Sequence, residues 1–332
     1  MNGGSERGAP AAPPAGMTDG GTPLSVSIGP VHFRNPILLA AGTAGYGREL
    51  EDVMDLDVVG GLVTKAVSVA PRHGAPEPRV AEFDGGMINA VGLANPGLQE
   101  VSQVHLPWLA RHHANTRKFY NVVGFAVDEF ATVVRGLEEA GQRNPGGVDG
   151  FELNVSCPNV KHGGTEFGAD PSSLAAVVRG AREATARSIF VKLSPTLPDI
   201  AAAARIAVDN GADGITVVNT IPGLVIDVER RKPAVGFGSG GISGRAILPV
   251  GVLATWRVSR AVNVPIIGVG GVATATDALQ YVLAGASLVG IGTGALRDPR
   301  TPERIVKDLA SWCSRHGIAS IATLRGSLEW PA

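Results

Sequence analysis

The sequence predicts an α/β protein built as one (β/α)8 TIM barrel, with an N-terminal β-hairpin and long inserted loops at its C-terminal face. Three observations lead to this prediction. Eight short apolar runs are rich in β-branched residues, stretches of helical spacing lie between them, and glycines follow several of those stretches. Strands that are apolar throughout and followed by helices are typical of a parallel sheet covered on both sides.

The predicted elements follow one another at regular intervals. The strands cover residues 36–41, 61–67, 118–124, 150–156, 188–194, 214–220, 264–270 and 288–294. The helical stretches cover residues 128–140, 172–186, 199–210, 245–262, 273–284 and 302–316. An open, doubly wound sheet is the alternative, because residues 268–273 fit a dinucleotide-binding pattern. The acidic residue that should follow this pattern about 20 residues later is missing, so we favour the barrel.

Composition bounds the domains and partners. Residues 1–22 are rich in glycine, alanine and proline, which predicts a disordered tail before a single domain over residues 23–332. A net charge of −1 gives no reason to expect nucleic acid or an anionic membrane as a partner. The longest uncharged run, residues 278–296, is broken by glycines and polar residues, so no membrane span is expected. Two cysteines without a secretory signal predict a cytoplasmic location.

Two glycine-rich strand ends occur in succession, at residues 268–271 and 290–294. They end the seventh and eighth predicted strands. In a barrel, the loops after these strands form a phosphate-binding corner, where backbone N–H groups and a helix N-terminus face the anion. The pair therefore predicts a ligand that carries a phosphate.

Polar side chains stand late in several apolar strands. Each alone has an ordinary explanation, since an asparagine often caps a turn and a lysine can reach solvent. The carboxyl ends of barrel strands meet at one face, so we expect the set to converge there. Buried amides and ammonium groups need partners, and a polar planar ligand would supply them. The residues are Lys65, Asn121, Asn154, Cys157, Lys192, Ser194, Asn219 and Thr220.

Residues 151–164 form the stretch where we expect the chemistry. The alternating run ends at Ser156 and is followed at once by Cys157 and Pro158, which indicates a strand that delivers the Cys157 thiol to a rigid loop. A small buried apolar cysteine is the alternative interpretation. Long excursions at residues 68–97 and 221–244 leave the same end of the barrel, and loops of this length are usually binding loops or lids.

Several motifs occur together in one order along residues 24–297. The most specific are Asn-Ala-Val-Gly-Leu at residues 89–93 and Ser-Cys-Pro-Asn-Val-Lys at residues 156–161. Others are Val-Lys-Leu-Ser-Pro at 191–195, Gly-Gly-Ile-Ser-Gly at 240–244 and Pro-Ile-Ile-Gly-Val-Gly-Gly at 265–271. Because of these motifs, the chain resembles the class 1 dihydroorotate dehydrogenases, which are flavin enzymes of pyrimidine biosynthesis. It resembles the class 1B catalytic subunit most. Membrane-bound class 2 enzymes use a serine as base, so Cys157 argues against that class.

The resemblance implies an FMN across the barrel mouth with dihydroorotate stacked on it. The implied FMN-binding residues are Ala41, Lys65, Ala66, Asn121, Asn154, Lys192, Val218, Gly244, Gly270, Gly271, Gly292 and Thr293. The implied substrate-binding residues are Lys65, Asn89, Ala90, Val91, Gly92, Leu93, Asn154, Asn159, Asn219 and Thr220. The family usually has a serine where Ala41 stands, so we expect its backbone to serve.

The implied chemistry assigns two catalytic residues. Cys157 would take the C5 proton of dihydroorotate while the flavin N5 takes the C6 hydride, and a thiol has a pKa suited to that task. Lys192 would stabilise the negative charge of the reduced flavin. No metal site is expected. Two other functions stay open: an FMN oxidoreductase acting on a related ring such as dihydrouracil, and a non-redox phosphate-binding barrel.

The electron acceptor is not fixed by the sequence. By resemblance we expect a homodimer and a separate subunit with FAD and an iron–sulfur cluster that passes electrons to NAD. Two cysteines cannot ligate such a cluster within this chain. Fumarate and a quinone are the alternative acceptors.

Overall fold

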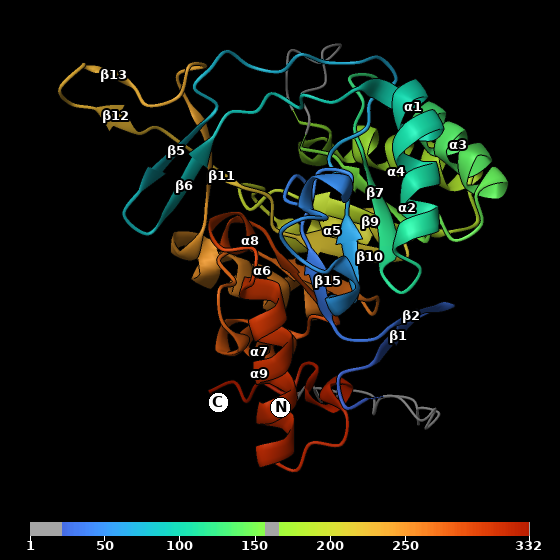
Figure 1. Ribbon diagram of the computed structural model, residues 1–332, viewed down its shortest axis with the longest axis vertical. Helices are drawn as coiled ribbons and strands as arrows, with labels where there is room; N and C mark the ends of the chain where they lie inside the picture. The colour runs from blue at the N-terminus through green and yellow to red at the C-terminus, as the bar shows by residue number, and fades with distance from the viewer. Residues whose placement is uncertain (1–21, 157–165, 332) are drawn as a thin grey trace, which may run out of the picture.

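The computed structural model describes residues 22–156 and 166–331 and confirms the predicted (β/α)8 barrel (Figure 1). Eight parallel strands close in the order β10-β15-β16-β3-β4-β7-β8-β9. They are β3 (Ile37–Leu39), β4 (Gly61–Val63), β7 (Arg117–Val122), β8 (Gly150–Asn154), β9 (Ser188–Leu193), β10 (Gly214–Val217), β15 (Ile266–Val269) and β16 (Leu288–Ile291). Each corresponds to a predicted strand but is shorter, because most of the predicted carboxyl ends leave the hydrogen-bonded ladder and form the mouth.

The predicted helices are present. They are α3 (Val127–Arg143), α4 (Pro171–Ala184), α5 (Ile200–Asp209), α6 (Leu248–Ser259), α7 (Ala275–Ala284) and α9 (Thr301–Arg315). Shorter helices are α1 (Gly97–Glu100), α2 (Leu106–His112) and α8 (Thr293–Arg297), with a π-helical segment at Val101–His105. Single 3-10 turns are Arg48–Leu50, Leu56–Val58, Phe167–Ala169, Arg245–Ile247 and Ile321–Leu324. Among the described residues, no helix combines the length and apolar character needed to cross a bilayer.

The barrel interior is apolar at its N-terminal end. The Phe119 ring packs edge-on against Phe190, with ring centroids 5.6 Å apart. Glycines on neighbouring strands make room for both rings: a Cβ at Gly150 would lie 2.5 Å from Phe119, and one at Gly214 would lie 2.3 Å from Phe190. Large and small residues thus alternate around the barrel, which fills it with side chains as in other barrels of this type.

The predicted N-terminal hairpin extends this apolar layer. Strands β1 (Val26–Ile28) and β2 (Val31–Phe33) pair antiparallel just before the first barrel strand. The Phe33 ring is fully buried and stacks on Phe119 at a centroid distance of 6.1 Å. The hairpin therefore contributes an aromatic side chain to the same core.

The two long excursions pair with each other at the opposite end. Strands β5 (Val80–Phe83) and β6 (Gly86–Asn89) come from the first, and β11 (Ile221–Gly223) and β14 (Gly240–Ser243) from the second. They form one antiparallel sheet in the order β11-β14-β6-β5, seen at the upper left of Figure 1. The sheet lies over one side of the barrel mouth, so the cavity described below has a wall that the barrel alone does not provide.

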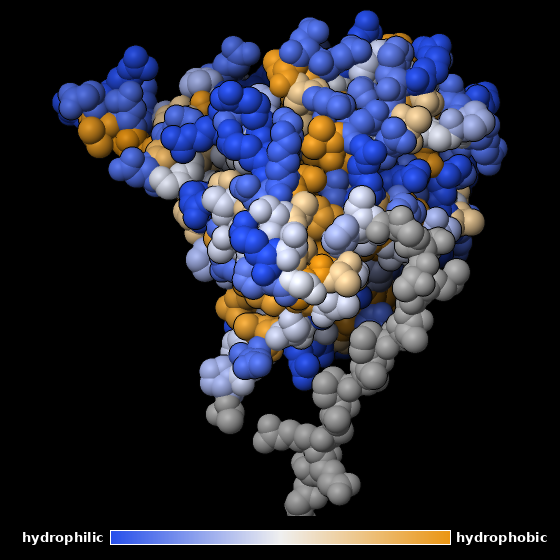
Figure 2. All heavy atoms as spheres, turned by 60° about the horizontal axis from the view of Figure 1, so that its bottom comes forward, coloured by the Kyte–Doolittle hydropathy of each residue, from blue (hydrophilic) through white to orange (hydrophobic). Residues whose placement is uncertain are grey.

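A short arm projects beyond this sheet. It consists of β12 (Ile226–Asp227) and β13 (Lys232–Pro233), which pair antiparallel. The Leu224, Ile226 and Val228 side chains are exposed, and the arm at the upper left of Figure 2 carries apolar atoms beside hydrophilic ones.

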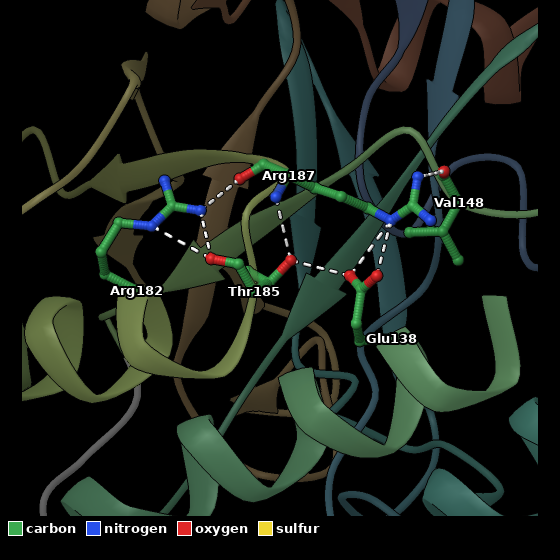
Figure 3. Close-up of polar contacts among 5 residues, drawn as sticks. All are labelled: Glu138, Val148, Arg182, Thr185 and Arg187. Carbon is green, nitrogen blue, oxygen red and sulfur yellow. Dashed lines mark hydrogen bonds and ion pairs between the residues drawn. The ribbon is translucent and has the colours of Figure 1, made fainter. Parts of the chain in front are cut away.

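A polar network fixes two outer helices to the barrel (Figure 3). Glu138 on α3 accepts hydrogen bonds from the Arg187 Nε at 3.0 Å and from the Thr185 hydroxyl at 2.7 Å. Arg187 also donates through Nη1 to the carbonyl of Val148, 2.7 Å away. Arg182 on α4 donates to the carbonyl of Arg187 at 2.7 Å. The network joins α3, α4 and the segments that lead into β8 and β9.

We predict that Glu138→Ala lowers the free energy of unfolding by about 1–3 kcal/mol, because Arg187 and Thr185 lose a charged acceptor. Urea denaturation of the full chain measures the change. Glu139→Ala is the matched control, since Glu139 is the exposed neighbour on the same helix and should cost less than about 0.5 kcal/mol. Equal effects of the two substitutions would contradict the prediction.

Candidate functional site

One cavity of about 1300 Å³ opens at the C-terminal ends of the barrel strands. Single-ligand pockets are usually about 300–1000 Å³, so this space suits a cofactor together with a substrate. Every described residue that was predicted to bind the cofactor or the substrate lines it: Ala41, Lys65, Ala66, Asn89, Ala90, Val91, Gly92, Leu93, Asn121, Asn154, Lys192, Val218, Asn219, Thr220, Gly244, Gly270, Gly271, Gly292 and Thr293. Ser194, which was also expected at the mouth, instead lines a smaller cavity that shares Asn219 and Thr220 with this one. Cys157 and Asn159 lie outside the described residues. Ser156, which precedes Cys157, lines the cavity.

One end of the cavity is a glycine corner, formed by Gly244, Gly270, Gly271, Gly292 and Thr293. Gly271 has a φ of 76°, and a Cβ there would lie 2.6 Å from Leu248 at the start of α6. Only glycine satisfies both the positive φ and this close approach. The Thr293 hydroxyl donates to the Ser243 hydroxyl at 2.8 Å, which joins the N-terminus of α8 to the sheet.

Tyr281 on α7 supports the glycine corner from behind. Its hydroxyl donates to the carbonyl oxygen of Gly270 at 2.7 Å. Burial raises the pKa of Tyr281, so the phenol stays protonated and remains a donor. Because N–H and C=O point in opposite directions across a trans peptide, this bond directs the N–H of Gly271 away from α7. A cavity-lining backbone donor is thereby held in one orientation.

The interior below the mouth is polar. The Asn121 amide donates to Glu152 Oε1 at 2.7 Å, and the Lys192 ammonium lies 3.8 Å from the same oxygen. The side chains of Glu152 and Lys192 are 2% and 8% exposed. Asn121 and Lys192 line the cavity, whereas Glu152 lies beneath them and contacts both. On the neighbouring strand, Glu152 is opposite Phe190. A buried carboxylate and ammonium are tolerated because each compensates the other.

Amide groups gather at the other side of the cavity. The Asn219 amide donates to Asn154 Oδ1 at 3.3 Å, and Asn219 Oδ1 accepts from the Thr220 backbone N–H at 2.9 Å. Asn89 donates to the carbonyl of Gly241 at 3.1 Å, which connects β6 to β14. These contacts fix the amides at the ends of β8, β10 and β6. Fixed amides offer both donors and acceptors, as recognition of a pyrimidine ring requires.

The charges around the cavity suit anions. Among the described residues, Glu82 and Asp84 also line it, and the cationic side chains that line it are Lys65, Arg72, Lys192, Arg245 and Arg297. The Arg72 guanidinium also lies 4.1 Å from the ring centroid of Phe125, a cation–π contact at the mouth. A phosphate and a carboxylate would both find compensating charge here.

Sequence reasoning did not single out Glu152, Arg245, Asp277 or Tyr281 as residues of the site. Local sequence patterns could have identified two of them, Asp277 and Arg245. Thr274 followed three residues later by Asp277 is a capping-box pattern, and the structure forms this box at the start of α7. Arg245 directly follows the Gly240–Ser243 strand and Gly244. The roles of Glu152 and Tyr281 depend on contacts between strands and helices that no local pattern encodes.

The chain matches a family model described as dihydroorotate dehydrogenase over residues 23–312. It belongs to the dihydroorotate dehydrogenase family. It is 43% identical over 306 residues to the dihydroorotate dehydrogenase B (NAD(+)) catalytic subunit of Pelobacter propionicus, covering 92% of this chain and 98% of that protein. The protein of the same description from Trichlorobacter lovleyi gives the same identity and coverage.

Two further comparisons widen this family context. A putative dihydroorotate dehydrogenase A (fumarate) from Solibacter usitatus is 43% identical over 307 residues, which is 92% of this chain and 99% of that protein. The crystal structure of a dihydroorotate dehydrogenase from Eimeria tenella, in complex with ferulenol, superposes with a TM-score of 0.77 at 24% identity and covers 92% of this chain and 88% of that one. At that identity the superposition shows the fold alone.

Membership in the dihydroorotate dehydrogenase family confirms the predicted family and enzyme class. The protein is an oxidoreductase of a flavin-dependent family whose members act in pyrimidine biosynthesis. A non-redox phosphate-binding barrel is therefore no longer an alternative. The individual roles predicted for the cavity residues stay predictions, although the structure brings those that it describes together.

We predict that Glu152→Leu alone lowers the free energy of unfolding of the flavin-free chain by about 3–5 kcal/mol, because Lys192 is left buried without its counter-charge. Adding Lys192→Met should restore part of the loss, since the double variant has no unpaired charge. Urea denaturation of the two single variants and the double variant gives the coupling energy. Strictly additive effects would show that the two groups do not stabilise each other.

Proposed function

We propose that this chain is the catalytic subunit of a class 1B dihydroorotate dehydrogenase, which uses FMN to oxidise dihydroorotate to orotate. One observation carries the proposal: a single cavity joins a glycine corner suited to a phosphate with a set of fixed amides suited to a pyrimidine. The identity to two relatives described as class B catalytic subunits supports the same assignment. The carboxylate of dihydroorotate distinguishes it from dihydrouracil, and the cationic lining favours the substrate that carries it.

The donor set of the cavity fits FMN. The glycine corner would supply backbone N–H groups for the phosphate, including that of Thr293, whose hydroxyl already donates to Ser243. Lys65, Asn121, Lys192 and Val218 would border the isoalloxazine ring. When bound, the flavin supplies the hydride acceptor of the reaction.

The protein groups then have separate tasks. Asn89, Asn154 and Asn219 would orient the dihydropyrimidine through its alternating carbonyl and N–H groups. The reaction removes a proton from C5 and a hydride from C6, and we assign the proton to Cys157. Support for this assignment comes from Ser156, because the residue before Cys157 already borders the cavity. Lys192, held by Glu152, would stabilise negative charge next to the ring.

The electron acceptor has two candidates. Relatives described as NAD(+) enzymes favour transfer to NAD through a second subunit carrying FAD and an iron–sulfur cluster. The equally identical relative described as a fumarate enzyme favours direct transfer to fumarate. We favour the NAD route, because two of the three relatives reported above share that description. A homodimer and a cytoplasmic location are the further expectations from the family resemblance.

We predict that the purified chain is yellow and reduces an artificial dye with dihydroorotate, but does not reduce NAD by itself. Absorbance spectra and dye-reduction assays measure both properties, with dihydrouracil as the comparison substrate. Fumarate is tested in the same assay. NAD reduction by the isolated chain would contradict the need for a second subunit, and rapid fumarate reduction would favour the class 1A acceptor.

We predict that Cys157→Ser retains FMN and loses about 10²- to 10⁴-fold in the rate of dihydroorotate oxidation at neutral pH, the range expected for loss of a general base. Serine keeps the size of the side chain but ionises far less readily. Flavin absorbance and steady-state rates are the measurements. Cys313→Ser is the matched control, because Cys313 is buried in α9 and away from the cavity lining. A near wild-type rate for Cys157→Ser would rule out the assignment.

A further inference from the structure

Arg245 is a charged side chain whose place at the glycine corner is fixed by the fold. It begins the 3-10 turn Arg245–Ile247 directly after Gly244 and lines the cavity. Gly244 has a φ of 91°, and a Cβ there would lie 2.8 Å from the Cα of Gly86 on β6. The backbone N–H of Ala246 donates to the carbonyl of Gly85 at 2.9 Å. The backbone that carries Arg245 is therefore anchored to the four-stranded sheet.

Asp277 fixes the other end of the Arg245 side chain. The guanidinium Nη1 donates to Asp277 Oδ2 at 2.9 Å, and Nη2 lies 3.5 Å from Oδ1. The Asp277 side chain is only 5% exposed, whereas that of Arg245 is 56% exposed. The same carboxylate accepts from the backbone N–H groups of Ala273 and Thr274 at 3.0 and 2.9 Å. One buried carboxylate thus connects the guanidinium to the loop that follows Gly271.

We propose that Arg245 binds the FMN phosphate through its side chain and that Asp277 positions it for this task. The inference rests on the proposed function, because it needs FMN in the cavity. Among the described residues, it adds a side-chain cation to a corner whose other donors for the phosphate are backbone N–H groups.

The chemistry of the guanidinium favours this role over that of a simple helix cap. Arginine has five N–H donors in a rigid planar fork, and only two face the Asp277 carboxylate. The remaining donors belong to a side chain that lines the cavity and is still half exposed. Guanidinium and phosphate form charge-assisted hydrogen bonds of matched geometry. Because the pair with Asp277 already restricts the side chain, less conformational entropy is lost when the phosphate binds.

Asp277 has enough partners to tolerate a nearby anion. Its carboxylate is compensated by Arg245, by the Ala273 and Thr274 N–H groups and by the N-terminus of α7. Tyr281, on the same helix, orients the Gly270–Gly271 peptide. The first turns of α7 therefore position both a backbone donor and a side-chain donor of the glycine corner.

The test compares FMN with riboflavin, which has the same ring but no phosphate. The full chain is freed of flavin, and dissociation constants are measured by quenching of flavin fluorescence. We expect Arg245→Ala and Arg245→Gln to weaken FMN binding by about 10- to 100-fold, the loss of a hydrogen bond to a charged group, and to leave riboflavin binding unchanged. FMN binding by the wild-type chain should also weaken more steeply with salt than binding by the variants.

Arg230→Ala is the matched control. Arg230 also pairs with an aspartate, Asp227, at 3.5 Å, but it lies on the projecting arm and does not line the cavity. The substitution changes the net charge equally and should leave both affinities unchanged. Thermal unfolding shows that each variant folds, and Arg245→Gln keeps a polar side chain if the alanine variant is unstable.

The outcomes distinguish FMN binding by the chain from phosphate binding by Arg245. If the Arg245 variants bind FMN as the wild type does, or lose FMN and riboflavin equally, Arg245 does not bind the phosphate. If the wild-type chain binds FMN and the variants lose FMN alone, the proposal holds. If the wild-type chain binds neither flavin, both the FMN assignment and the role of Arg245 are wrong.

Discussion

The buried Glu152 carboxylate is the contact on which the interior of the site depends. It lies between an apolar layer, where Phe119 and Phe190 pack together, and the cavity that Asn121 and Lys192 line. An ammonium at that depth would be unstable alone, because desolvation opposes the charged form. The carboxylate allows a cation to stand at the base of the cavity and fixes the amide beside it. The positions of Asn121 and Lys192 at the base of the cavity therefore depend on this one compensated charge.

The second constraint is the pairing of two insertions that are far apart in the sequence. β6 and β14 pair across the mouth, with Asn89 opposite Gly241. This pairing connects the loop that follows Asn89 to the segment that ends at Gly244 and Arg245. The barrel therefore provides the floor of the cavity, and the paired insertions provide a wall that reaches both of its ends.

The sequence predicts the barrel well because its signals are local. Apolar runs rich in β-branched residues identify the eight strands, glycine stops mark the ends of several helices, and most polar residues late in the strands converge at the mouth by barrel geometry. Strand ends are predicted too long, because residues such as Asn219 and Thr220 continue the pattern after the ladder stops. The pairing of the insertions, the Glu152–Lys192 contact and the Tyr281–Gly270 bond are not predictable in this way. The first two depend on residues from different strands or insertions, and the third depends on how α7 packs against the end of β15.

The β6–β14 pairing also has a consequence for biogenesis. Met87 and Ser243 are opposite each other in the sheet, so more than 150 residues of chain separate the two halves of one cavity wall. Contacts of such long sequence separation form late, since the entropy of closing the intervening loop must be offset first. The glycine corner lies beyond residue 240, so most of the polypeptide must be synthesised before the proposed FMN can bind there. On that proposal, the N-terminal half of the chain emerges from the ribosome without its ligand.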